Sequence, residues 1–348
     1  MIYDDCYKAY NKNRFSFLKN KKILITGSSG LIGQYFIGFF LHSLNSQNKP
    51  KKIVLISRSG LPKHLNFIKK NKCFEYRKID LSKSKDLKIE NFDFIVHAAT
   101  YAQPQKFTKN AIETINLNTT TTNELLKKIK KKGKFLFISS SEVYSGLSKS
   151  KLTELDIGNT NPLHPRSCYI ESKRCGEAIV NAYRNKNYDA KSVRLCLAYG
   201  PGVKKDDNRV INEFIKKGLI QKKIEISGGE KNIRSYLYMS DAIKMLVDIL
   251  FFGKESVYNV GGMKKISIRQ LASYIAKELN VPYLSKINKK NIQGAPKNVQ
   301  IDIGKYKKEF KKSSFVDLKD GIKKTIIWYK NLLKINGRKI WYIEHELD

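Results

Sequence analysis

Acidic residues are scarce in this sequence. Its 348 residues include 31 Asp and Glu against 67 Lys and Arg, a formal net charge of +36 at pH 7. A charge of this size is typical of proteins that bind nucleic acid or an acidic surface. However, only eleven of the basic residues are Arg and the Lys residues are spread over the whole chain, whereas nucleic-acid sites concentrate Arg and aromatic residues on one element. We therefore interpret the charge as a compositional bias that could attract an anionic substrate, and we do not expect a nucleic-acid partner.

Long hydrophobic runs are also missing. The apolar stretch Tyr35–Leu44 is interrupted by Gly38 and His42, and it has roughly half the length that a bilayer span needs. The first ten residues are too polar for a signal peptide. The five Cys residues form no Cys-x-x-Cys pair and no Cys/His ligand spacing, so no metal site or disulfide framework is predicted. We expect a cytoplasmic protein with no membrane span and no metal.

Short apolar segments recur through the first 200 residues. The predicted strands are 22–26, 53–56, 74–79, 92–96, 134–138 and 191–195, with helical patterns at 31–44, 108–131 and 167–185. Strands that alternate with helices predict an α/β fold with a Rossmann-type, doubly wound parallel sheet. Beyond residue 202 the pattern becomes irregular, with shorter helices predicted at 208–220, 241–252 and 267–279.

This change of pattern predicts two structural units. We expect a Rossmann domain at 21–200, to which 234–265 returns, and a smaller C-terminal substrate-binding lobe built from 201–233 and 266–330. Residues 1–20 would form an N-terminal extension, including a short helix that packs on the body, and 331–348 a C-terminal tail.

A glycine-rich turn directly follows the first predicted strand and opens a helix. Its glycines are Gly27, Gly30 and Gly33, an arrangement typical of dinucleotide binding. The first would allow the tight turn, the second a close approach of the pyrophosphate, and the third close packing of helix on strand. The start of the helix would then face the phosphates. We predict that the turn binds the cofactor, together with the residues between the glycines, Ser29, Leu31 and Ile32.

The second predicted strand ends in Ser57-Arg58. NAD-binding sites usually carry an acid here that holds the ribose 2′-hydroxyl, whereas an Arg accommodates the 2′-phosphate of NADP. The cofactor is therefore predicted to be NAD or NADP, with Arg58 favouring NADP; alternatively, Arg58 stacks on the adenine. After the third strand, Asp80 and Leu81 could bind the adenine, or Asp80 could cap a turn.

Tyr169 and Lys173 lie four residues apart, on one face of a predicted helix. An ammonium group beside a phenol lowers the pKa of the phenol, so Tyr169 could act as a base. Such a pair is common and mostly structural when it stands alone. Here, however, the fifth strand ends in the hydroxyl-rich segment Ser139–Tyr144, and the carboxyl ends of parallel strands face the ligand crevice of a doubly wound fold.

Together these segments resemble the NAD-dependent epimerase/dehydratase family of extended short-chain dehydrogenases. The resemblance covers residues 21–330 and follows the order of the family. Its matching segments are 26–33, His97-Ala98-Ala99, Asn116, 139–144, Tyr169 with Lys173, 194–202, 234–241 and 258–261.

The resemblance implies a catalytic set. Tyr169 would take the proton from a sugar 4-hydroxyl while hydride moves to the nicotinamide, and Ser140 would share that hydrogen bond. Lys173 would hold the nicotinamide ribose and tune Tyr169. Asn116 would orient Lys173, directly or through water.

The resemblance also implies a binding set and partners. Ala98 and Ala99 would contact the cofactor, while Ser141, Arg209 and Arg234 would contact the substrate, with Arg234 on its diphosphate; the alternative for Arg234 is a surface ion pair. The expected substrate is a nucleotide-diphosphate sugar. A homodimer is expected through the helices at 108–131 and 167–185.

The residues after Ser140 bear on the type of reaction. In 4,6-dehydratases the hydroxyl residue is followed by Asp-Glu, but here it is followed by Ser141-Glu142. This segment, 161–169 and 208–211 all resemble UDP-glucuronate decarboxylases, in which the 4-keto acid loses carbon dioxide readily. We therefore favour lyase chemistry in the synthesis of surface-polysaccharide precursors. Glu142 would be a catalytic base or a residue that orients others.

Two departures keep other reactions open. The decarboxylases carry an Arg just before the segment that matches 302–305, but here the residues are Val299-Gln300, with Lys297 the nearest cation. The family's Asn before Tyr-Gly-Pro is Leu197. Epimerisation or 4-keto reduction is the alternative. A more remote one is a non-enzymatic, cofactor- or RNA-binding member of the fold, against which the retained Ser140, Tyr169 and Lys173 argue.

Overall fold

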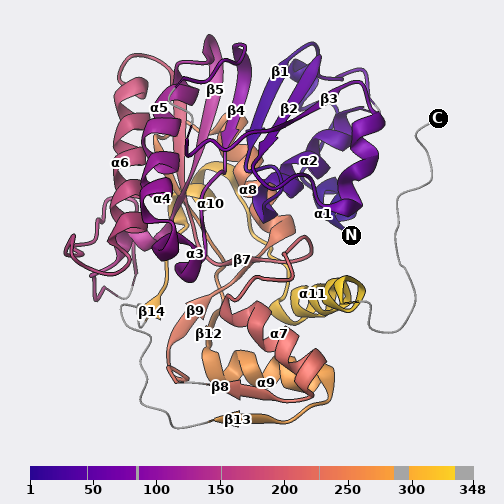
Figure 1. Cartoon of the computed structure of the whole chain (residues 1–348), viewed down its shortest axis with the longest axis vertical. Helices are drawn as coiled ribbons and strands as arrows, with labels where there is room; N and C mark the ends of the chain where they lie inside the picture. Colours follow the sequence, from indigo (N-terminus) through magenta and orange to yellow (C-terminus); the bar gives the residue numbers. More distant parts are fainter. Residues whose placement is uncertain (45, 84–85, 150, 227, 286–297, 334–348) are drawn as a thin grey trace.

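A seven-stranded sheet forms the centre of the larger part of the molecule (Figure 1). The computed structural model describes residues 1–44, 46–83, 86–149, 151–226, 228–285 and 298–333. The strand order is β11-β6-β5-β4-β1-β2-β3, and every neighbouring pair is parallel. The strands are β1 (Lys22–Thr26), β2 (Lys52–Ser57), β3 (Phe74–Lys78), β4 (Phe92–His97), β5 (Ile129–Ser140), β6 (Asp189–Leu195) and β11 (Val257–Val260).

Helices cover both faces of this sheet, which explains why its strands are continuous apolar runs. In β1, Ile23 and Ile25 belong to one buried cluster and Leu24 to another on the opposite face. The first face is covered by α1 (Ile2–Tyr7), α2 (Leu31–Leu44), α8 (Met239–Phe252) and α10 (Gly304–Phe310); the second by α4 (Ala111–Asn118), α5 (Thr120–Leu126) and α6 (Ser167–Arg184). The predicted Rossmann-type, doubly wound fold is confirmed.

The single helix predicted at 108–131 is wrong. The segment forms α3 (Pro104–Lys109), α4 and α5, and β5 already begins at Ile129. Four consecutive threonines, Thr119–Thr122, lie at the junction of α4 and α5, and β-branched residues are poor helix formers. The Lys-rich segment after them joins the sheet because Ile129 pairs with Phe92 of β4, so tertiary pairing overrides its local helical tendency.

The smaller lobe lies below the sheet in Figure 1 and has a core of its own. Its helices are α7 (Val210–Gln221), α9 (Ile268–Leu279) and α11 (Leu318–Leu332). Its short strands are β7 (Ala198–Tyr199), β8 (Ile224–Ile226), β9 (Ile233–Ser235), β10 (Leu237–Tyr238), β12 (Lys265–Ser267), β13 (Tyr283–Ser285) and β14 (Asn298–Val299). β7 and β10 pair with each other directly below the large sheet. The smaller lobe is therefore joined to the large sheet through β7, which follows β6, and through β10, which leads into α8.

One segment departs from the expected division of the chain. Ile301, Ile303 and Tyr306 belong to the cluster of the large sheet, and Tyr306 donates a hydrogen bond to Asp248 of α8 at 2.6 Å. Residues 301–310 therefore pack on the Rossmann domain, because burial of these apolar side chains outweighs their proximity in sequence to the smaller lobe. Of the predicted tail, residues 334–348 lie outside the described residues.

Residues 1–20 join both parts of the molecule. Asp5 of α1 is buried and accepts hydrogen bonds from the hydroxyls of Tyr35 (3.1 Å) and Tyr238 (2.6 Å) and from Nζ of Lys324 (3.1 Å). Phe15 is fully buried in the cluster beside α2 and α8. The segment thus links α2 of the Rossmann domain to β10 and α11. Within the described ranges, no helix is long and apolar enough to span a bilayer.

Candidate active site

A cavity of about 550 Å³ opens at the carboxyl ends of the sheet strands, against the smaller lobe. Most of the predicted site residues line it together. They are Gly27, Ser29, Gly30, Leu31, Ile32, Gly33, Arg58, Asp80, Leu81, Ala98, Ala99, Ser140, Ser141, Glu142, Tyr169, Arg209 and Arg234. Lys173 and Asn116 are not among the lining residues. In the described part of the chain, no group of three His, Cys, Asp or Glu residues could hold a metal ion.

The glycine-rich turn between β1 and α2 has the shape that a dinucleotide needs. Gly27 has φ +68°, and a Cβ on it would lie 2.6 Å from the Ala98 carbonyl oxygen. At Gly30, by contrast, the nearest atom to an added Cβ is 3.1 Å away, and this residue faces the cavity. The protein itself thus requires glycine at position 27, while at position 30 the stronger requirement would come from a ligand. This cradle at the start of α2 fits a cofactor pyrophosphate.

His97, at the end of β4, holds the floor of this turn. Its Nε2 donates to the Leu117 carbonyl at 2.9 Å, and its Nδ1 accepts from the Thr26 hydroxyl at 2.7 Å. The ring is buried, and burial lowers the pKa of His97 to about 3. A neutral His97 therefore ties β1 to α4 beneath the cofactor turn.

The adenosine end of the cavity contains Arg58 and Asp80. The Arg58 guanidinium lies over the Tyr101 ring, 4.8 Å from its centroid, and also donates to the Tyr101 hydroxyl. Oδ1 of Asp80 accepts from the backbone N–H and the hydroxyl of Ser82 at 3.1 and 2.6 Å. Asp80 therefore caps a turn, as the alternative interpretation holds, and still faces the cavity.

Tyr169 and Lys173 lie on α6 under the nicotinamide end. Lys173 is buried, its Nζ donates to the Ile138 carbonyl at 2.6 Å and lies 5.8 Å from the centroid of the Tyr169 ring. Burial raises the pKa of Tyr169 to about 12, while a hydrogen bond with Ser140 lowers it. Burial also lowers the pKa of Lys173 to about 7. In the protein alone, burial therefore dominates the pKa of Tyr169, and the acidifying effect expected from Lys173 is not among the causes of its shift.

In the described part of the chain no hydrogen bond joins Asn116 to Lys173; Nδ2 of Asn116 donates to the Ser82 carbonyl at 3.2 Å and Nζ of Lys173 to the Ile138 carbonyl. Two residues on, Asn118 is buried and its Nδ2 donates to the hydroxyl of Ser172, the neighbour of Lys173, at 2.9 Å. Its Oδ1 is buried without a hydrogen-bond partner in the structure. The two side chains lie about 200° apart on a helix, so Asn118, and not Asn116, faces α6. A role of Asn116 through water stays a prediction.

The sugar end contains an ion pair that the sequence did not reveal. Arg166 contacts Glu142 at 2.5 Å, and their side chains are 10% and 19% exposed. Nε of Arg166 and Oε2 of Glu142 are both buried without a hydrogen-bond partner. Both residues line the cavity beside Tyr169, which stacks on Phe107 at a centroid distance of 4.6 Å. A ligand group with a donor and an acceptor would satisfy both atoms. The available signal was the position of Arg166, three residues before Tyr169.

The smaller lobe contributes two further arginines. Arg209, just before α7, forms an ion pair with Asp207 at 2.6 Å, and Arg234 lies on β9. Both line the cavity, and burial lowers the pKa of Arg234. Two guanidinium groups in the lining make this end of the cavity suited to an anionic ligand, because Arg forms strong charge-assisted hydrogen bonds with carboxylates and phosphates. Leu197, the residue that replaces the expected Asn, lines the same wall and has φ +35°.

Comparison with known proteins finds similar sequences that carry the same enzyme name in different organisms. The chain is 27% identical over 317 residues to UDP-glucuronic acid decarboxylase 1 of Arabidopsis thaliana, covering 90% of this chain and 71% of the relative. It is 28% identical over 320 residues to UDP-glucuronic acid decarboxylase 1 of Xenopus tropicalis, covering 90% and 73%.

Solved structures show the same fold. The dTDP-glucose 4,6-dehydratase of Streptomyces venezuelae with NAD bound matches with a TM-score of 0.74 and 22% identity, over 89% of this chain and 97% of that one. The UDP-glucose 4-epimerase of Thermotoga maritima matches with a TM-score of 0.74 and 19% identity, over 90% and 99%. These relatives agree with the predicted NAD-dependent enzyme of nucleotide-sugar chemistry. The family model described as "NAD dependent epimerase/dehydratase family" matches residues 23–261, and the chain therefore belongs to that family.

Proposed function

We propose that the protein oxidises the 4-hydroxyl of a nucleotide-diphosphate sugar to a ketone and that loss of carbon dioxide follows. One observation carries this proposal: a single cavity is lined by the dinucleotide turn at one end and by Ser140, Tyr169 and Glu142 at the other, with Arg209 and Arg234 beside them. A cofactor and an anionic sugar donor could therefore meet at Tyr169.

The oxidation needs a base for the hydroxyl proton and an acceptor for hydride. Tyr169 would take the proton and Ser140 would share its hydrogen bond. Lys173 would hold the cofactor ribose, and Asn118 would support α6 next to Lys173. When bound, NAD or NADP supplies the hydride acceptor, and its oxidised ring adds a positive charge that favours the ionised phenol.

The lyase step is supported by what surrounds Tyr169. The cavity-lining acids are Asp80, Glu142 and Asp207, and Asp207 is paired with Arg209. Of these, Glu142 lies beside Tyr169, and the described lining residues place no second acid next to it for the elimination of water. A 4-keto uronate needs no second acid for its cleavage, because its C5–C6 bond breaks to release carbon dioxide and the electron pair forms an enolate. The enolate then takes a proton at C5 from water. Arg166 and Arg234 would offset the charge of its carboxylate and diphosphate.

The reaction can be tested with purified protein. UDP-, GDP-, CDP- and dTDP-sugars, including the uronates, would be incubated with NAD or NADP and followed by mass spectrometry. We expect loss of carbon dioxide from a uronate. Loss of water would indicate a dehydratase, and unchanged mass with a new isomer an epimerase. No turnover of any sugar, together with unchanged ligand binding in a Tyr169→Phe variant, would contradict the enzymatic proposal.

Three finer features are part of the same proposal. Arg58 and the lack of an acid at the end of β2 support NADP as the preferred cofactor. The cytoplasmic location stays a prediction. A homodimer through α4 and α6 is supported by Ile112 and Ile115 of α4, whose residues are 72% and 42% exposed, since exposed apolar side chains on neighbouring turns favour association.

The dimer can be tested by light scattering. Ile112→Glu should shift the protein to monomers, because a charge would be buried in the interface. Ile220→Glu is the matched control, since Ile220 is 60% exposed on α7, away from this face. A monomeric wild-type protein would contradict the prediction.

A further inference from the structure

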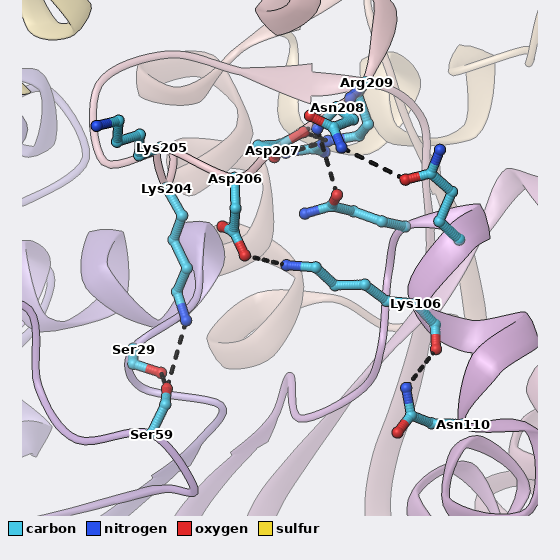
Figure 2. Close-up of polar contacts among 12 residues, drawn as sticks. Ser29, Ser59, Lys106, Asn110, Lys204, Lys205, Asp206, Asp207, Asn208 and Arg209 are labelled. Carbon is cyan, nitrogen blue, oxygen red and sulfur yellow. Dashed lines mark hydrogen bonds and ion pairs between the residues drawn. The ribbon is translucent and has the colours of Figure 1, made fainter. Parts of the chain in front are cut away.

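A loop from the smaller lobe lines part of the cavity and contacts the Rossmann domain (Figure 2). The loop, residues 203–209, follows β7. Nζ of Lys204 donates to the Ser59 hydroxyl at 3.4 Å, and Asp206 pairs with Lys106 of α3 at 2.6 Å. The backbone N–H of Asn208 donates to the side chain of Gln103 at 3.3 Å. The loop therefore places its side chains against the cofactor half of the cavity.

Lys204 reaches the point where two cofactor-binding segments meet. Ser29 belongs to the glycine-rich turn and Ser59 follows the end of β2, and their hydroxyls are 3.2 Å apart. In a dinucleotide fold the turn meets the pyrophosphate and the end of β2 meets the adenosine ribose. The space beside Ser29 and Ser59 is therefore where the ribose 2′ position is expected.

The charges at this point are positive. Lys204, Arg58 and Lys106 all line the cavity. The pKa of Lys204 is lowered, first by burial and also by the positive charges of Lys106 and Arg58, against the opposing effect of Asp206. The strand end that would carry an acid in an NAD site is Ser57 instead, whose hydroxyl donates to the Gly60 carbonyl. Lys106 is paired with Asp206, whereas Lys204 and Arg58 donate to the hydroxyls of Ser59 and Tyr101. A phosphate would give Lys204 and Arg58 a charged partner that an unphosphorylated ribose would not.

We propose that Lys204 is a cofactor-specificity residue that reaches from the smaller lobe and, with Arg58, Ser29 and Ser59, binds the 2′-phosphate of NADP. The inference rests on the proposed dinucleotide enzyme. It adds that the phosphate bridges the two parts of the molecule, so that cofactor choice is set by both rather than by the end of β2 alone.

The test uses two probes that differ only in the phosphate, 2′,5′-ADP and 5′-AMP. Their affinities would be measured by titration calorimetry on protein freed of bound nucleotide. We expect the wild type to prefer 2′,5′-ADP by roughly 30-fold, and Lys204→Ala to reduce that preference about tenfold, because one charge-assisted hydrogen bond is lost. Equal affinities in the wild type, no binding of either probe, or an undiminished preference in Lys204→Ala would each overturn the proposal.

Matched variants separate this role from general charge. Lys205 is the neighbouring lysine, does not line the cavity, and its side chain points away from Ser29 and Ser59 (Figure 2); Lys205→Ala should keep the full preference. Ser59→Asp should favour 5′-AMP, since a carboxylate repels the phosphate. If Lys205→Ala lost as much as Lys204→Ala, the proposal would fail.

The assay needs neither a sugar nor turnover. A preference for 2′,5′-ADP in a protein that turns over no nucleotide sugar would sustain this inference and contradict the proposed function. Turnover without such a preference would do the reverse.

Discussion

The cofactor end and the sugar end of the cavity are built by different means. At the cofactor end the backbone of the turn at 27–33 forms the cradle, and His97 supports it from below. At the sugar end the wall is made of long side chains, notably the Glu142–Arg166 pair, Arg209 and Arg234. A backbone cradle fixes what binds through local geometry. A wall of side chains allows the substrate to change by single substitutions, which is how one fold comes to host several reactions.

The largest effect is expected where the two ends meet. In Tyr169→Phe, kcat should fall about 10³-fold, because the proposed base for the hydroxyl proton is removed. Substrate binding should change little, and both quantities can be measured by steady-state kinetics and calorimetry. Tyr183→Phe is a control on the same helix, since the Tyr183 hydroxyl contacts Asn123 away from the cavity. Unchanged turnover in Tyr169→Phe would show that Tyr169 is not the base between the cofactor end and the sugar end.

The ion pair at the sugar end should be costly to break. Arg166→Met leaves the carboxylate of Glu142 buried and unpaired, which should lower the free energy of unfolding by roughly 3 kcal/mol. Adding Glu142→Gln should restore part of this loss, about 1–2 kcal/mol, because the two effects are coupled. Denaturant unfolding of the two single variants and the double variant measures this coupling. Strictly additive losses would mean that the two side chains act independently.

The cofactor end should respond to acid. The pKa of His97 is about 3 in the folded protein and about 6.5 in an unfolded chain. The unfolded chain therefore binds the proton more readily, and stability present above pH 6.5 is lost as the pH falls toward 3. From pH 6.5 to 5 this loss should be about 1.6 kcal/mol. Burial lowers the pKa of His64 as well, so the comparison is between wild type and His97→Gln, which cannot titrate. Equal acid sensitivity of the two would contradict the prediction.

The smallest effect is expected at Leu197. Its φ of +35° lies in the left-handed region, which Asn tolerates better than Leu. In Leu197→Asn the relief of strain and the loss of partial apolar burial should nearly cancel, leaving stability within about 1 kcal/mol. An added amide hydrogen bond should lower the KM for the nucleotide sugar a few-fold. A higher KM would show that the wall prefers an apolar contact.

The contrast between a backbone turn and a wall of long side chains also explains which features could be predicted from sequence alone. The glycine turn, the paired Tyr169 and Lys173, and six of the sheet strands follow from spacing within short segments. The contacts of Arg166 and Lys204 could not be predicted in the same way, because Arg166 pairs with Glu142, 24 positions away, and Lys204 meets Ser59, 145 positions away. The contact of Asn118 with Ser172 could not be predicted, because the helical register of a threonine-rich segment cannot be fixed without its neighbours. Lys297, considered for the substrate carboxylate, lies outside the described residues.

The contacts of Asp5 constrain the order in which the parts of the protein can fold during synthesis. This side chain bonds to Tyr35, to Tyr238 and to Lys324, which is 319 positions further along the chain. A ribosome would have released α1 and α2 long before α11 exists. The glycine turn and its neighbouring strands could then form early, while the junction between the two parts closes only when residue 324 has emerged. A chain that stalls or is truncated before residue 324 would thus contain most of the sheet, while Asp5 would lack its contact with Lys324.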